Sequence, residues 1–207
     1  MIETSARVTV PLLVYCLMPN HWHLVLWSRT DGDISKYLQW LTGTHAQRWR
    51  VAAGSIGRGA VYQGRFRSVP VQTDIHLVRL CGYVERNALR AGLVGRAELW
   101  RWSSLAVEAR NNSNRPILSP WPIPQPADWI NCVNQEEPAS ELERIRTSIK
   151  RNIPYGTPQW EVNTAARLGL ALRKHGRPGE KRGREGFRTR KPSRPLFEAE
   201  DPPDPSS

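Results

Sequence analysis

The pattern of apolar and polar residues changes from strand-like to helix-like within the first third of the chain. Residues 7–16, "RVTVPLLVYC", are rich in Val and Leu and predict a strand, in which Pro11 fits only an edge or a bulge because it has no N–H to donate. The "MPN" that follows predicts a turn, so residues 7–28 should form a hairpin. Its second strand carries His21 and His23 on one face and Trp22 on the other, since successive side chains of a strand alternate.

Two segments with helical periodicity follow this hairpin. The first covers residues 34–53, with Asp33 as its expected N-cap and with glycines after its end. The second begins at a cap on Thr73 or Asp74 and extends to about Leu89. Between them, the alternation in residues 65–72 predicts a strand with one positively charged face.

The composition and periodicity of the second half of the chain differ from those of the first, which suggests three further parts after a first domain at residues 1–110. Residues 111–127 hold five prolines and predict a linker or a strapped-down loop. Residues 128–175 predict a helical region, with one helix over 139–151 capped by Ser140 and another over 158–173. Residues 176–207 predict a disordered tail, basic at first and acidic at its end.

Composition narrows the possible partners. The 30 Lys and Arg residues outnumber the 19 Asp and Glu residues, and the resulting net charge of +11 favours nucleic acid as the partner. No apolar run is long enough to cross a membrane and the first residues do not form a signal peptide, so we expect a cytoplasmic protein with no membrane contact. Cys16, Cys81 and Cys132 lack metal-site spacing and are expected to be reduced structural thiols.

The strongest candidate chemistry combines the two histidines with a helix. Tyr83 and Asn87 are four residues apart in "YVERN" and therefore share one helix face. If that helix crosses the strand of His21 and His23, the Asn87 oxygen can complete a three-ligand site with open positions. Such mixed ligands suit Mg²⁺ or Mn²⁺ better than a closed zinc site.

Each of these residues also has a structural explanation. A histidine pair on a strand is more often a surface or hydrogen-bonded feature than a metal site. Tyr83 is equally well explained as a core or interface tyrosine, and Asn87 taken alone is better explained as a helix C-cap. Tyrosine is a weak nucleophile at neutral pH unless a metal or a base assists it.

Nicking and rejoining of DNA would suit this set of residues. A tyrosine that attacks phosphorus in DNA becomes joined to the 5′ phosphate and releases a 3′ hydroxyl, so strand exchange needs no ATP. The chain has no GxxxxGK[ST] loop. Five arginines flank the proposed site and are candidates for contacts to the DNA backbone, or else form a solvated face: Arg65, Arg67, Arg79, Arg86 and Arg90.

Four motifs in order resemble a known family. "YCLMPNHWHLVLW", "VYQGRFRSVPVQ", "YVERNALRAGLV" and "WRWSSL", over about residues 12–106, resemble the REP-associated tyrosine transposases, a branch of the single-tyrosine HUH endonucleases. The likeness resumes at "IRTSIKRNIPYGTPQW" and "ARLGLALRKHGRPG".

The resemblance implies that His21, His23 and Asn87 bind the divalent metal and that Tyr83 is the nucleophile. It implies a substrate of single-stranded DNA with short palindromes folded as hairpins. It also implies an α+β fold with a ferredoxin-like antiparallel sheet and packed helices, followed here by a helical C-terminal extension. Family members carry a strand and a helix before the equivalent of "VYCLMPN", for which about a dozen residues leave no room, so the fold is expected to be shortened at its N-terminus.

That expected gap leaves a second hypothesis open. A DNA-hairpin binding protein that cannot cleave would have the same charge and the same tail, and a structural metal protein that happens to be basic is a weaker third possibility. The sequence favours neither a monomer nor a homodimer.

Overall fold

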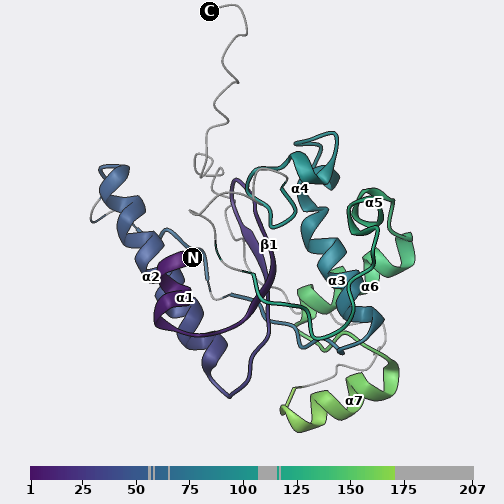
Figure 1. Cartoon of the computed structure of the whole chain (residues 1–207). Coiled ribbons are helices and arrows are strands. Elements are labelled where there is room, and N and C mark those ends of the chain that lie inside the picture. The colour runs from purple at the N-terminus through teal and green to yellow at the C-terminus, as the bar shows by residue number, and fades with distance from the viewer. Residues whose placement is uncertain (56, 58, 65, 107–115, 117, 171–207) are drawn as a thin grey trace, which may run out of the picture.

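The computed structural model describes residues 1–55, 57, 59–64, 66–106, 116 and 118–170. Within these residues the chain has an α+β fold, as the sequence predicts, with a two-stranded antiparallel sheet and several helices (Figure 1). The ferredoxin-like arrangement of the fold stays a prediction. The tail at residues 176–207 lies outside the described residues.

The predicted hairpin is present. Strand β1 (Leu12–Leu17) pairs with β2 (Trp22–Leu26), and Cys16 lies opposite His23. The register shifts at a bulge between Leu12 and Val14, directly after Pro11, which is where the missing N–H of proline disturbs a ladder. The prediction was wrong for the start of the strand, because residues 2–7 form a short helix, α1 (Ile2–Arg7).

The two faces of the hairpin pack against different helices (Figure 1). On one face Trp22, Leu24 and Leu26 pack against the core formed with α2 (Asp33–Ala52). On the other face Val25 and the buried Cys16 pack against α3 (Ile75–Glu85). The alternation of β2 therefore places His23 on the α3 side, while Trp22 packs behind it as the sequence suggests.

One of the two predicted helix caps in this half of the chain is present and the other is not. Asp74 caps α3 by accepting a hydrogen bond from the backbone N–H of His76 at 2.8 Å. Asp33 is not a cap, since it is the first residue of α2 and the N-cap is Gly32 with φ of 83°. Its carboxylate instead accepts a hydrogen bond from the N–H of Thr30 at 3.0 Å.

The second predicted helix is interrupted near the candidate tyrosine. Helix α3 ends at Glu85, Arg86 follows as its C-cap, and a short helix α4 (Asn87–Arg90) continues the chain.

The predicted strand at 65–72 was wrong over the residues that the structure describes, 66–72. Only Val71 makes a bridge, an isolated parallel one to Tyr155. The backbone of this segment bonds instead to Tyr155, with the Gln72 N–H donating to the Tyr155 carbonyl at 3.0 Å and the Tyr155 N–H donating to the Pro70 carbonyl at 2.9 Å. The guanidinium of Arg67 also donates to the backbone carbonyl of Lys150 at 2.6 Å, so the segment is joined to the C-terminal region.

The C-terminal region is helical. After the 3₁₀ turn η1 (Ala97–Leu99) come α5 (Trp129–Asn134), α6 (Ala139–Arg151) and α7 (Pro158–Arg167). Helix α6 has the predicted bounds, but its N-cap is Pro138 and Ser140 lies inside it. Helix α7 ends before residue 173, and residues 171–175 lie outside the described part. No helix in the described ranges is long and apolar enough to cross a membrane.

The proline-rich segment is tied to the hairpin where the structure describes it. The N–H of Ser119 donates to the carbonyl of Leu12 at 2.8 Å, and the Trp121 ring lies 5.0 Å from that of Trp129. Residues 107–115 and 117 are outside the described part.

Candidate functional site

The rings of His21 and His23 lie close together at the start of β2. Their centres are 5.0 Å apart with an angle of 87° between the ring planes. Two imidazoles that share one cation at about 2.1 Å have ring centres roughly 4.5 to 5.2 Å apart for ligand angles between about 90° and about 109°. The spacing of these two rings therefore fits a shared ion.

Both imidazoles are held in the neutral form that can donate a lone pair. Burial lowers the pKa of His21, and it lowers the pKa of His23 to about 4, with smaller contributions from His21 and Arg90. The side-chain oxygen of Asn20 lies 2.6 Å from Nδ1 of His21. Since that oxygen can only accept, Nδ1 carries the proton and Nε2 has the free lone pair.

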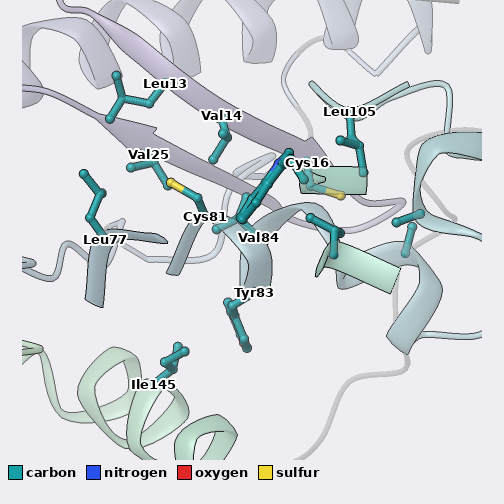
Figure 2. Close-up of a cluster of buried hydrophobic side chains, with 14 of the residues drawn as sticks. Leu13, Val14, Cys16, Val25, Leu77, Cys81, Tyr83, Val84, Leu105 and Ile145 are labelled. Atoms are coloured by element: carbon teal, nitrogen blue, oxygen red, sulfur yellow. The ribbon is translucent and has the colours of Figure 1, made fainter. Parts of the chain in front are cut away.

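Tyr83 lies beside this pair. Its ring centre is 6.0 Å from that of His23, with an angle of 84° between the planes. Figure 2 shows Cys81 and Val84 pointing from α3 toward the hairpin, whereas Tyr83 leaves the helix on a different side. The ring is 7% exposed, and no described residue forms a hydrogen bond with the hydroxyl, which is left available to another partner.

The side chain of Asn87 folds back onto the tyrosine-bearing helix. Its amide nitrogen donates to the carbonyls of Tyr83 at 3.2 Å and Val84 at 3.4 Å. In the described part of the chain no hydrogen bond engages its side-chain oxygen, so that oxygen remains free to act as a ligand.

The donor set at this site is small. Within the described residues no three His, Cys, Asp or Glu side chains form a group that could hold a metal ion. Two imidazoles and one amide oxygen would therefore leave several positions open for water and phosphate, which is the arrangement expected for Mg²⁺ or Mn²⁺. The spacing of the two imidazoles fits such an ion, and the convergence of the Asn87 oxygen on them stays a prediction.

Four of the five arginines proposed to contact DNA make contacts within the protein: Arg67, Arg79, Arg86 and Arg90. Arg67 is bonded to the end of α6, as described above, and Arg65 lies outside the described residues. Arg79 pairs with Glu141 at 3.1 Å, and Arg86 donates to the carbonyl of Val133 at 3.1 Å. Their contacts to DNA stay a prediction.

Arg90 is the arginine that touches the candidate nucleophile. Its guanidinium carbon lies 4.2 Å from the centre of the Tyr83 ring, and Nη2 donates to the Tyr83 carbonyl at 2.7 Å. Nη1 bonds to the carboxylate of Glu137 at 2.7 Å.

Sequence reasoning missed Glu85, a buried carboxyl between Tyr83 and Asn87. Only 3% of it is exposed, and its two oxygens accept from the Ser104 hydroxyl at 2.5 Å and the Trp129 indole at 2.6 Å. Burial raises its pKa to about 7. The signal available was a glutamate one turn after Cys81 and on the same helix face, a position that an apolar residue usually fills.

Comparison with known proteins gives one match. Residues 1–87 match the family model described as "Transposase IS200 like". This matched range contains the hairpin, both histidines, Tyr83 and Asn87. No curated protein and no solved structure matches the chain.

Proposed function

We propose, on the premise that residues 1–87 belong to the IS200-like transposase family, that this protein acts in DNA transposition by nicking single-stranded DNA with Tyr83. The match to the IS200-like transposase family supports a role in DNA transposition in general. The metal dependence, the tyrosine intermediate and the hairpin substrate are our proposals.

The observation that carries the proposal is the contact between the rings of His23 and Tyr83, at 6.0 Å. These residues come from β2 and α3, and the fold brings a phenol next to a pair of neutral imidazoles. Tyr83 contacts His23, and the His23 ring lies 5.0 Å from that of His21, a spacing that fits a common ion.

In the proposed reaction the hydroxyl oxygen of Tyr83 attacks the scissile phosphorus. A bond forms between that oxygen and phosphorus while the phenol proton passes to water, the bond from phosphorus to the 3′ oxygen breaks, and the 3′ oxygen takes a proton from water and leaves as a hydroxyl. The 5′ phosphotyrosine then exchanges with another 3′ hydroxyl, which transfers the strand. His21, His23 and the Asn87 oxygen would hold a Mg²⁺ or Mn²⁺ ion, which neutralises charge on the phosphate.

The proposed substrate follows from the motifs. REP-type palindromes folded as hairpins are the DNA on which the resembling transposases act, and the net charge of +11 suits a polyanionic partner.

The test is formation of a covalent adduct. The full chain is incubated with Mn²⁺ and labelled single strands that carry different palindromes, and denaturing gels and peptide mass spectrometry locate the DNA on the protein. We expect an adduct on Tyr83 in the parent, none in Tyr83→Phe, and a normal amount in Tyr37→Phe, which changes a buried tyrosine in the other core. An adduct that persists in Tyr83→Phe would contradict the proposal.

The alternative is a DNA-hairpin binding protein without cleavage activity. The low exposure of Tyr83, 7%, favours it, because a nucleophile must reach phosphorus. Equal hairpin affinity in the parent, Tyr83→Phe and His21→Ala, with no adduct in any of them, would support this alternative and reject the nickase.

A further inference from the structure

Arg90 contacts Tyr83 in two ways at once. Its guanidinium lies over the face of the ring at 4.2 Å, and it donates to the carbonyl of the same residue at 2.7 Å. The first contact fixes the distance between the two side chains, and the second fixes the guanidinium relative to the backbone of α3.

Glu137 holds the other end of this guanidinium. The ion pair spans 2.7 Å, and the two side chains are only 17% and 19% exposed. Fully exposed pairs of this kind contribute little, but this pair is shielded from water and its arginine also makes two contacts to Tyr83. A planar guanidinium with three partners in different directions has little freedom to turn.

Glu137 belongs to a part of the chain that is distant in sequence from Tyr83. Glu137 lies in the turn before α6, far along the chain from the hairpin and the tyrosine-bearing helix. Nearby, Arg86 donates to the carbonyls of Val133 and Gln135, which fastens the same turn to the end of α3. The C-terminal region is thus held against the side of α3 that carries Tyr83.

We infer that Arg90 is a positioning residue for Tyr83 and that Glu137 keeps it in place, so the C-terminal region completes the candidate site. This inference rests on the proposed function and assigns Arg90 a task other than the DNA contact expected from sequence. Arg90 turns the phenol ring toward His23, and Glu137 prevents the guanidinium from swinging away to solvent or to phosphate.

The first test needs no DNA. Hydroxyl-radical footprinting with mass spectrometry measures how well the ring of each tyrosine is covered. In Arg90→Gln we expect oxidation of Tyr83 to rise at least about fivefold, with a smaller rise in Glu137→Gln and a partial return in Arg90→Lys. Unchanged protection of Tyr83 in Arg90→Gln would overturn the inference.

A matched control exists in the same region. Arg144 lies over the ring of Tyr155 at 5.4 Å and pairs with Glu161 at 3.4 Å, so it repeats the arrangement at another tyrosine. Arg144→Gln should raise oxidation at Tyr155 and leave Tyr83 protected. If Arg144→Gln exposes Tyr83 as strongly as Arg90→Gln does, general loosening of the C-terminal region explains the effect and the inference fails.

The second test separates positioning from DNA binding. With a hairpin strand at saturation, Arg90→Gln should slow single-turnover adduct formation at least about tenfold while the Kd for the strand changes less than about twofold. A weaker Kd with an unchanged saturated rate would make Arg90 a phosphate contact and overturn the inference. If the parent forms no adduct, the proposed nicking function fails, whereas the footprint of Tyr83 still decides the role of Arg90.

Discussion

Trp129 donates its indole N–H to the carboxyl of Glu85 across 2.6 Å. This bond joins α5 to the end of α3, two residues after Tyr83. The Ser104 hydroxyl lies 2.5 Å from the other Glu85 oxygen and 3.1 Å from the carbonyl of Tyr15, and it has only one proton to donate. The Ser104 proton is therefore shared between the Glu85 carboxyl and the Tyr15 carbonyl.

The raised pKa of Glu85, about 7 against an ordinary 4.5, predicts a pH-dependent stability. Below about pH 4.5 the carboxyl is protonated in the folded and the unfolded chain, and its stabilising contribution is complete. Between 4.5 and 7 only the unfolded chain loses the proton, so this contribution falls as the pH rises, by up to about 3 kcal/mol. Denaturant unfolding at pH 5 and pH 8 should show this loss in the parent and not in Glu85→Gln. Glu136→Gln, at an exposed carboxylate, should behave like the parent, and a loss that persists in Glu85→Gln would contradict the assignment.

Removing one imidazole should strongly weaken divalent-ion binding at the hairpin. The close rings of His21 and His23 make each of them a candidate ligand. His23→Ala should therefore weaken Mn²⁺ binding more than about 100-fold, which is more than the loss usually caused by removing a residue that only hydrogen-bonds to a metal ligand. Isothermal titration calorimetry measures this binding directly. His45→Ala is the control, because His45 is bonded to Tyr62 at 2.8 Å, away from the site. Equal Mn²⁺ affinity in His23→Ala and the parent would leave the pair without a metal role.

Asn20 should affect the metal through His21 alone. Its oxygen fixes the proton on Nδ1 of His21, so Asn20→Ala should lower Mn²⁺ affinity by about 10 to 100-fold while the fold is kept. NMR of labelled histidine should show the Nδ1 proton on His21 in the parent and a mixture of tautomers in the variant. An unchanged tautomer with unchanged affinity would show that the Asn20 contact has no effect on the site.

Gly156 should tolerate no side chain. A Cβ at this position would lie 2.6 Å from the Trp160 ring and 2.7 Å from the side-chain oxygen of Gln72. We expect Gly156→Ala to lower the free energy of unfolding by about 1 to 3 kcal/mol, as measured by denaturant titration. Gly95→Ala is the matched control, because nothing lies within 4 Å of the added Cβ there. Similar losses in both variants would indicate a general effect of removing glycine.

Local sequence patterns predicted the elements that need few distant contacts. The hairpin, the bounds of α6, most of α2 and the Asp74 cap depend on periodicity, proline and capping chemistry within a few residues. The same local rules failed at 66–72, where alternation suggested a strand. There the side chain of Arg67 and the bridge of Val71 engage the C-terminal region, and no short window of sequence shows that contact.

The sequence by itself determined the chemistry available: two histidines on one strand face, and a tyrosine and an asparagine one helical turn apart. Tertiary structure decided what these groups meet. Packing of α3 against the hairpin brought Tyr83 to 6.0 Å from His23, buried Glu85, and used the arginines to fasten helices that begin some forty residues later. The physical reason is that side-chain type and local spacing follow from the covalent chain, whereas burial, ion-pair partners and pKa values depend on which distant surfaces exclude water together.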